Sequence, residues 1–339
     1  MNIPKITPGT RSLTSEFDQS DTIFVIDHMP PIKTIHINVN GQNRYKQNTI
    51  IDLFNESNID YKSKKFIFDH YLQFDDFGPK IGILDNIFLK QAGGFKTYIK
   101  DWNISTNTDI CKNLTFMSNK PRPHRIICAT VLANLFNIDG LNYTYENIDK
   151  YSIINSELLL NTNYNIDVNK ILLNRWVVHD ADFEALWYVD GKKLVDRKHK
   201  HDYEVFADCL YESIYRTSAT SLLTEPNFYE HGCMFTEKTL MAIYSGHFMI
   251  WVGNWKAAET AKRIGIDTFD DIIDHSYQYI EHPGDRVVES ILKNLNFLKN
   301  IHLQQDLRNM NILRLKRNLD LVRNLELLSE NILSLSCVN

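Results

Sequence analysis

Residues 235–264 read FTEKTLMAIYSGHFMIWVGNWKAAETAKRI, and this stretch decides the fold. Thr236 can cap a helix in which apolar residues recur at helical spacing, and Gly246 is suited to end that helix. The run from His247 to Gly253 is continuously apolar, which is typical of a strand covered on both faces. Trp255 to Ile264 returns to helical spacing. The stretch therefore predicts a helix, a buried strand and a second helix.

Two further strands are predicted upstream, at Lys112 to Ser118 and at Ala219 to Glu225. The first precedes a helix predicted from Pro121 to Phe136, and the second precedes the helix described above. Strands that alternate with helices are typical of a parallel α/β sheet. Ligands of such sheets bind at the carboxyl ends of strands and the amino ends of helices. Because Glu237 and Lys238 occupy such a helix end, we expect a site there.

The chain has 339 residues, more than one hydrophobic core usually serves, so we expect two domains. The amino-terminal part shows apolar patterns of strands and short helices. Its predicted strands are 22–27, 33–39 and 65–72, its predicted helices are 49–56 and 85–90, and a turn is predicted at Gly93-Gly94. The fold class is predicted to be α/β, with domains at 1–108 and 109–290 and a helical tail at 291–339.

The tail has leucines every three or four residues without a regular heptad. We interpret it as helices that pack across both domains; the alternative is a face for homo-oligomerisation or binding. Its basic residues are expected to form a solvated stripe. They are Arg308, Arg314, Lys316, Arg317 and Arg323.

Composition favours a soluble globular protein, since 43% of the residues are hydrophobic and 23% are charged. The formal net charge of −5 argues against a protein whose main role is to coat nucleic acid. The five cysteines lack CxxC spacing and fit a reduced compartment. No signal-peptide core and no run of 18 apolar residues is found, so we expect a cytoplasmic protein without a membrane span.

Short segments along the chain follow a distinctive order. They are Phe116–Arg125 (FMSNKPRPHR), Leu222–Glu225 (LLTE), Phe235–Thr239 (FTEKT), Gly265–Phe269 (GIDTF) and Ile273–Tyr277 (IDHSY). Their order resembles the donor-binding half of the fucosyltransferase-like glycosyltransferases, and most closely phage and marine-virus proteins assigned to that class. The resemblance spans 109–286, about half of the chain. His275 and Gln278 stand where the family pattern has Glu and Asp, which leaves the role of that loop open.

The resemblance implies a GT-B architecture, in which two Rossmann-like domains face a cleft, and a nucleotide diphospho-sugar as donor. It assigns Lys238 to a phosphate, Glu237 to the ribose diol, and Arg125 or Arg122 to the leaving diphosphate. A cation at a helix amino end and a planar guanidinium suit those tasks. Glu225 and Tyr277 are further donor-contact candidates. The alternatives are a solvated helix turn for Glu237 and Lys238, a solvated basic loop at 116–125, and a loop-capping role for Glu225.

The resemblance also implies that an acidic residue of the first domain deprotonates the acceptor hydroxyl, and we look for it at strand ends. Asp27 and Asp69 are the candidates, with no motif to separate them from His28, His70, Asp75 and Asp76. Asp180-Ala181-Asp182 has the form of a metal-binding DxD motif, but we interpret it as structural, because the resembled class works without a metal. We expect no cofactor beyond the nucleotide-sugar. No P-loop, GxGxxG, HExxH or GxSxG motif is present.

The hypothesis is thus a glycosyltransferase, inverting and metal-independent by resemblance, that acts on a glycan or another hydroxyl acceptor. If the chain is phage-encoded, it would act in the host cytoplasm. One alternative is an inactive binding protein or virion-associated structural protein that keeps the fold. Another is an enzyme that glycosylates modified bases in phage DNA, for which the basic tail would bind the duplex.

Overall fold

The computed structural model describes most of the second half of the chain and shorter parts of the first half. The described residues are 5–6, 18–19, 22–25, 55–60, 65–68, 71–72, 80–83, 86–99, 102–105, 109–118, 122–137, 140–146, 178–179, 188–189, 192–193, 215–225, 232–233, 235–253 and 255–334. The predicted strand 33–39, most of the predicted helix 49–56, and residues 180–182 lie outside them.

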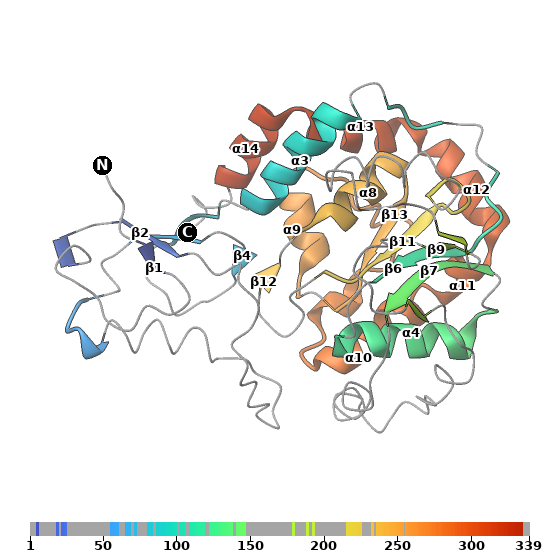
Figure 1. Ribbon diagram of the computed structural model, residues 1–339, viewed down its shortest axis with the longest axis horizontal. Coiled ribbons are helices and arrows are strands. Elements are labelled where there is room, and N and C mark those ends of the chain that lie inside the picture. Colours follow the sequence, from blue (N-terminus) through green and yellow to red (C-terminus); the bar gives the residue numbers. More distant parts are fainter. Residues whose placement is uncertain are drawn as a thin grey trace.

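A parallel sheet of five strands forms the centre of the molecule (Figure 1). Its order is β13-β11-β6-β7-β8, and every neighbouring pair is parallel. The strands are β6 (Leu114–Met117), β7 (Leu141–Glu146), β8 (Val178–His179), β11 (Thr220–Leu223) and β13 (Phe248–Trp251). Every residue of β6, β11 and β13 is buried, which agrees with the continuous apolar runs expected for a sheet covered on both faces.

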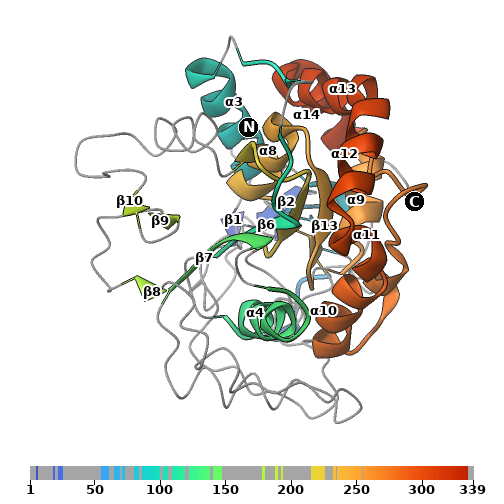
Figure 2. The same cartoon turned by 90° about the vertical axis from the view of Figure 1, so that its right-hand side faces the viewer.

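Helices cover both faces of this sheet (Figures 1 and 2). One face carries α8 (Glu237–Ser245), and the other carries α4 (Pro123–Leu135) and α10 (Pro283–Leu292). Both predicted boundaries of α8 have a local cause. The Thr236 side chain accepts a hydrogen bond from the main chain of Lys238 at the start of α8, and Gly246 ends α8 in the left-handed conformation with φ of 66°.

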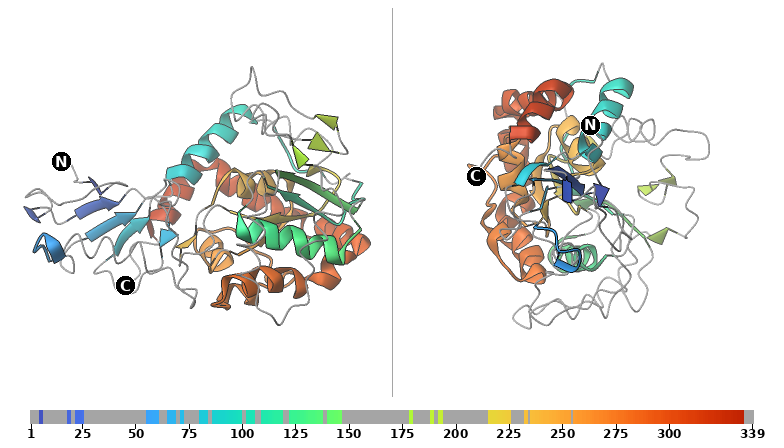
Figure 3. Two further views of the ribbon diagram at one scale, coloured as in Figure 1. Left: turned by 60° about the horizontal axis from the view of Figure 1, so that its bottom comes forward. Right: turned by 90° about the vertical axis from the view of Figure 1, so that its left-hand side faces the viewer.

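A second, smaller sheet lies to one side of the central one (Figures 1 and 3). Its order is β1-β2-β3-β5, with all pairs parallel. The strands are β1 (Lys5–Ile6), β2 (Thr22–Val25), β3 (Lys65–Phe68) and β5 (Lys80–Ile83). The prediction of an α/β protein with parallel strands is thus confirmed. The boundary between two domains at residue 108 stays a prediction.

The helix α3 (Asn86–Tyr98) corrects one prediction. A turn was expected at Gly93-Gly94, but both glycines lie inside α3. The reason is tertiary packing: Phe88, Ala92 and Phe95 are fully buried on one side of α3 and join the central hydrophobic core. This burial outweighs the weak helix propensity of glycine.

The predicted tail is helical (Figure 3). Its helices are α11 (Leu295–Lys299), α12 (Ile301–Met310), α13 (Ile312–Arg323) and α14 (Leu325–Ser334). The helix α13 packs on α8 and α3, and α14 packs on α3 and contacts β5 of the small sheet. The tail therefore lies against elements of both sheets, in line with the interpretation that it packs across the chain.

Shorter elements complete the description. They are β4 (Tyr71–Leu72), β9 (Tyr188–Val189), β10 (Lys192–Lys193), β12 (Gly232–Cys233), α9 (Ala257–Arg263) and the 3-10 helix η5 (Ser276–Tyr279). The pairs β4 with β12 and β9 with β10 are antiparallel. Within the described part of the chain, no helix combines the length and apolarity needed to cross a membrane.

Candidate functional site

The order in which the chain adds strands to the central sheet reverses between β6 and β11. From β6 the chain passes through α4 to β7 on one side, whereas from β11 it passes through α8 to β13 on the other side. The helices α4 and α8 therefore leave neighbouring strands toward opposite faces of the sheet (Figure 2). Open α/β sheets bind ligands in the crevice outside the strand ends at such a switch point. We name the residues gathered there the switch-point cluster: Arg122, His124, Arg125, Thr224, Glu225, Thr236, Glu237 and Lys238.

The end of β11 joins the two helix amino ends through hydrogen bonds. Arg125 in the first turn of α4 donates from Nη2 to the carbonyl oxygen of Thr224 at 3.1 Å. The ring Nε2 of His124 lies 3.0 Å from the carbonyl oxygen of Glu225. Arg125 is 4% exposed, and its neighbour Arg122 is half-buried at the amino end of α4. Residues about 100 positions apart in the chain are thus fixed to each other.

The Glu225 carboxylate holds the start of α8. Its Oε1 accepts hydrogen bonds from the main-chain N–H of Thr236 at 3.1 Å and the hydroxyl of Thr239 at 2.7 Å. Its Oε2 accepts one from the hydroxyl of Thr236 at 2.5 Å. Burial raises the pKa of Glu225, and the charge of Glu237 adds to the rise, while Lys238 and the threonine hydroxyls oppose it. Because Glu225 is fully buried and both oxygens are bonded within the fold, its geometry matches the capping alternative.

Glu237 and Lys238 form an ion pair near the surface, with Lys238 Nζ 3.0 Å from Glu237 Oε1. Their side chains are 23% and 13% exposed, respectively. Burial tends to raise the pKa of Glu237, but the Lys238 ammonium and hydrogen bonds outweigh burial and leave that pKa lowered. The second oxygen, Oε2, accepts a hydrogen bond from Nε2 of Gln91 on α3 at 3.2 Å. A ligand thus meets an ionised carboxylate beside an ammonium group.

The charges of three cations act on the buried ring of His124. Burial is the main cause that lowers the pKa of His124 well below its usual value, and the charges of Arg125, Arg122 and Lys238 lower it further. His124 is therefore neutral at physiological pH. Charges from the starts of both α4 and α8 therefore act on one buried side chain.

The remaining predicted site residues are Tyr277, Asp27 and Asp69. Tyr277 is 1% exposed in the core, and its hydroxyl bonds to the ring of His275 at 3.2 Å. A hydrogen bond to the main chain of Trp251 also engages Tyr277, whose pKa is raised by burial. The two base candidates, Asp27 and Asp69, lie outside the described residues.

The two residues that depart from the family pattern have structural partners. The Nε2 atom of His275 lies 3.0 Å from the carbonyl oxygen of Thr268, which joins the GIDTF and IDHSY segments. The Oε1 atom of Gln278 accepts a hydrogen bond from the main-chain N–H of Glu259 at 3.2 Å, in the first turn of α9. Both side chains therefore help to hold this loop in place.

The basic tail residues do not form the solvated stripe that was predicted. Arg308 is 2% exposed and donates to the carbonyl oxygens of Ser105, Ser245 and Gly246. Arg323 donates to the carbonyl oxygens of Ile99 and Trp102. These guanidinium groups satisfy carbonyls at helix ends, which periodicity alone could not reveal.

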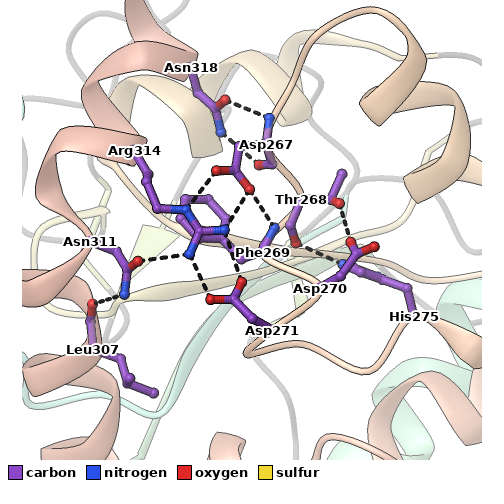
Figure 4. Close-up of polar contacts among 10 residues, drawn as sticks. All are labelled: Asp267, Thr268, Phe269, Asp270, Asp271, His275, Leu307, Asn311, Arg314 and Asn318. Atoms are coloured by element: carbon purple, nitrogen blue, oxygen red, sulfur yellow. Dashed lines mark hydrogen bonds and ion pairs between the residues drawn. The ribbon is translucent and has the colours of Figure 1, made fainter.

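Arg314 is also engaged within the fold (Figure 4). Its donors bind both carboxylate oxygens of Asp267 and of Asp271, and Nη1 binds Asn311. Its guanidinium lies 4.5 Å from the ring centroid of Phe269. These contacts occupy all five N–H donors of Arg314, so they clamp the loop 267–271 to α13 and leave no donor for a ligand.

Compared with known proteins, the sequence matches no family model, no curated protein and no solved structure. The function is therefore inferred from the residues of the switch-point cluster. Among the described residues, the His, Cys, Asp and Glu side chains form no group of three suited to a metal ion.

Sequence reasoning missed Gln91. It is separated from Glu237 by 146 positions and lies in a segment where only the beginning was predicted as helix. The signal that could have revealed α3 was the apolar spacing of Phe88, Ala92 and Phe95, which the adjacent Gly93-Gly94 obscured.

Proposed function

We propose that the protein is a glycosyltransferase that takes a sugar from a nucleotide diphospho-sugar at the switch-point cluster and transfers it to an acceptor hydroxyl. The observation that supports this proposal is that the starts of α4 and α8, which carry Arg122, Arg125 and Lys238, are joined by hydrogen bonds through the end of β11. A diphosphate carries charge that such a group of cations neutralises, and two helix amino ends add their N–H groups and dipoles.

Lys238 has donors left for a phosphate. An ammonium has three N–H donors, and among the described residues the only hydrogen-bond acceptor of Lys238 Nζ is Glu237. During transfer the bond between the sugar and the phosphate oxygen breaks, and negative charge grows on the leaving diphosphate. Cations held in advance beside that oxygen stabilise this charge without reorganisation. Glu237 is the acceptor for hydroxyl groups of the donor.

The wider architecture is part of the same proposal. The two parallel sheets are taken as the centres of two Rossmann-like domains that face a cleft in the GT-B manner. The second binds the donor, and the first presents the acceptor, a glycan or another hydroxyl compound. A carboxylate such as Asp27 or Asp69 removes the acceptor proton. The reaction is proposed to be inverting, to need no metal and to occur in the cytoplasm.

A donor panel tests this proposal. Purified full-length protein is incubated with GDP-, UDP- and CMP-linked sugars, and the release of free nucleotide is followed by chromatography. We expect slow hydrolysis of one nucleoside diphosphate sugar, because a working site usually leaks sugar to water. Lys238→Met and Arg125→Met should each reduce the release, whereas the exposed-surface control Arg317→Met should not. If a nucleotide-sugar binds but no nucleotide is released, the inactive binding protein is supported instead. If nothing binds and nothing is released, the proposed site is refuted.

A further inference from the structure

Gln91 of α3 contacts the site from a distant part of the chain. Its helix α3 packs beside the start of α8, where the rings of Phe88 and Phe235 have centroids 5.6 Å apart. From this helix the Gln91 amide reaches Oε2 of Glu237, while Lys238 occupies Oε1 of the same carboxylate. The two oxygens are therefore held by different partners, and the carboxylate plane is fixed by both.

The chemistry of the pair sets the orientation of the amide. A carboxylate whose pKa is lowered stays ionised and only accepts hydrogen bonds, so the NH₂ group of Gln91 must face Glu237. The amide oxygen Oε1 then points elsewhere. It is buried and finds no hydrogen-bond partner within the described structure. Glutamine at this position thus leaves a buried acceptor unsatisfied in order to donate to Glu237.

A buried acceptor without a partner lowers the stability of a folded protein. Methionine has nearly the same length and shape and would avoid that cost. A residue that is unfavourable for stability and touches a candidate binding group is typical of a functional position. For Gln91, stability and binding should therefore respond in opposite directions to the same substitution, whereas a purely structural hydrogen bond would make both fall together.

The position of α3 is firmly set relative to α8. The indole Nε1 of Trp102, just after α3, donates to the carbonyl oxygen of Tyr244 in α8 at 2.6 Å. Arg323 of the tail binds the main-chain carbonyls of Ile99 and Trp102. Gln91 is consequently presented to Glu237 by a rigid element, as a positioning residue requires.

We propose that Gln91 is a positioning residue that holds the Glu237 carboxylate in the orientation needed to accept hydrogen bonds from a vicinal pair of ribose hydroxyls. This inference depends on the proposed function, because it concerns the nucleotide of the same donor. On this proposal, the preference for a ribose over a 2′,3′-dideoxyribose originates in a contact between α3 and α8. A site built to bond hydroxyl groups rejects analogues that lack them.

The test is a calorimetric titration of the full chain with GDP and UDP, with their 2′,3′-dideoxy counterparts, and with inorganic pyrophosphate. For wild type we expect the better nucleotide to bind about tenfold more tightly than its dideoxy counterpart. In Gln91→Met the ratio should fall toward one, with pyrophosphate affinity unchanged and the thermal midpoint equal to or above that of wild type. The control Lys96→Ala, on an exposed position of α3, should leave the ratio unchanged.

Gln91→Glu provides a second variant of the same size. At pH 8 its carboxylate repels Glu237, so the ribose preference should be lost; near pH 5 the two carboxyls share a proton, and the preference should return. An unchanged preference in both variants overturns the role of Gln91 while leaving the proposed function intact. If wild type binds neither nucleotide nor pyrophosphate, the proposed function fails, and this inference fails with it.

Discussion

Each end of α8 has a cationic side chain, and the two ends differ in whether that side chain has hydrogen-bond donors left for a ligand. At the carboxyl end, Gly246 closes the helix, and Arg308 donates hydrogen bonds to the carbonyl oxygens of Ser245 and Gly246. The indole of Trp102 donates to the carbonyl oxygen of Tyr244. At the amino end, Glu225 fixes the first turn from beneath, and Lys238 lies near the surface with a single hydrogen-bond acceptor among the described residues.

This difference separates a cation that stabilises the fold from one that can bind a ligand. Arg308 sits where the helix dipole is negative, and its donors are used by backbone carbonyls. Lys238 lies where the helix dipole is positive, which is unfavourable for a cation, and its ion pair with Glu237 offsets this cost. A cation at this end of a helix is what the proposed diphosphate site requires.

The largest expected effect tests the carboxyl end. Arg308→Met removes the donors for three carbonyl groups, two of them in buried hydrogen bonds, and should lower the free energy of unfolding by about 3–5 kcal/mol. Urea unfolding of this variant and of Arg317→Met, an exposed position of α13, measures the difference. A loss below 1 kcal/mol for Arg308→Met would show that this end is not held as described.

The next effect concerns the helix stop. Gly246 has φ of 66°, and an added Cβ would lie 2.6 Å from Cγ2 of Ile104, so Gly246→Ala should destabilise the fold by about 2–3 kcal/mol. The matched control is Gly93→Ala inside α3. There an added Cβ would lie 3.6 Å from Cδ1 of Leu325, an ordinary contact, so we expect a gain of about 0.5–1 kcal/mol. Thermal unfolding of both variants checks the opposite signs.

The third prediction tests the amino end. Thr236→Val removes the helix cap and the hydroxyl that donates to Glu225, and should cost about 1–2 kcal/mol. It should also weaken nucleotide binding, because the first turn of α8 carries Glu237 and Lys238. Thr236→Ser keeps the hydroxyl and should restore both properties. If valine changes stability and binding no more than serine does, Glu225 and Thr236 do not position the site.

The smallest effect follows from acid titration. Burial, followed by the charge of Arg308, lowers the pKa of His247 to about 3, and His247 lies directly after the helix stop. An unfolded histidine titrates near 6.5, so below that pH the unfolded chain binds the additional proton and stability falls. From pH 8 to 5.5 the loss from His247 should be about 1.4 kcal/mol. His247→Asn should remove this part of the pH dependence, whereas exposed His302→Asn should not.

The sequence was sufficient where structure depends on neighbours in the chain. Thr236 and Gly246 fix the ends of α8 through local hydrogen bonds and backbone conformation, and both were predicted. The buried strand β13 followed from its continuous apolar run. For the same reason the amino end of α8 could be proposed as a site before its surroundings were known.

The failures concern contacts between distant residues. Gly93-Gly94 is a turn signal by composition, but the burial of Phe88 and Phe95 keeps the helix intact. Arg308 belongs to a helix with polar and apolar residues interspersed. That spacing does not predict its hydrogen bond to the carbonyl oxygen of Ser245 at the end of α8. Gln91 was missed because its partner lies 146 residues away. Such pairs need the three-dimensional arrangement.

One titration addresses the central claim, that the amino end of α8 binds a diphosphate. Wild type, Lys238→Met and Lys262→Met are compared by calorimetry with pyrophosphate and with the nucleoside diphosphate that binds best. Lys262 is a useful control because it is exposed and already paired with Asp270. We predict that Lys238→Met weakens both ligands about 10- to 100-fold with little change in stability, whereas Lys262→Met binds like wild type. Equal affinities for all three proteins would contradict the account.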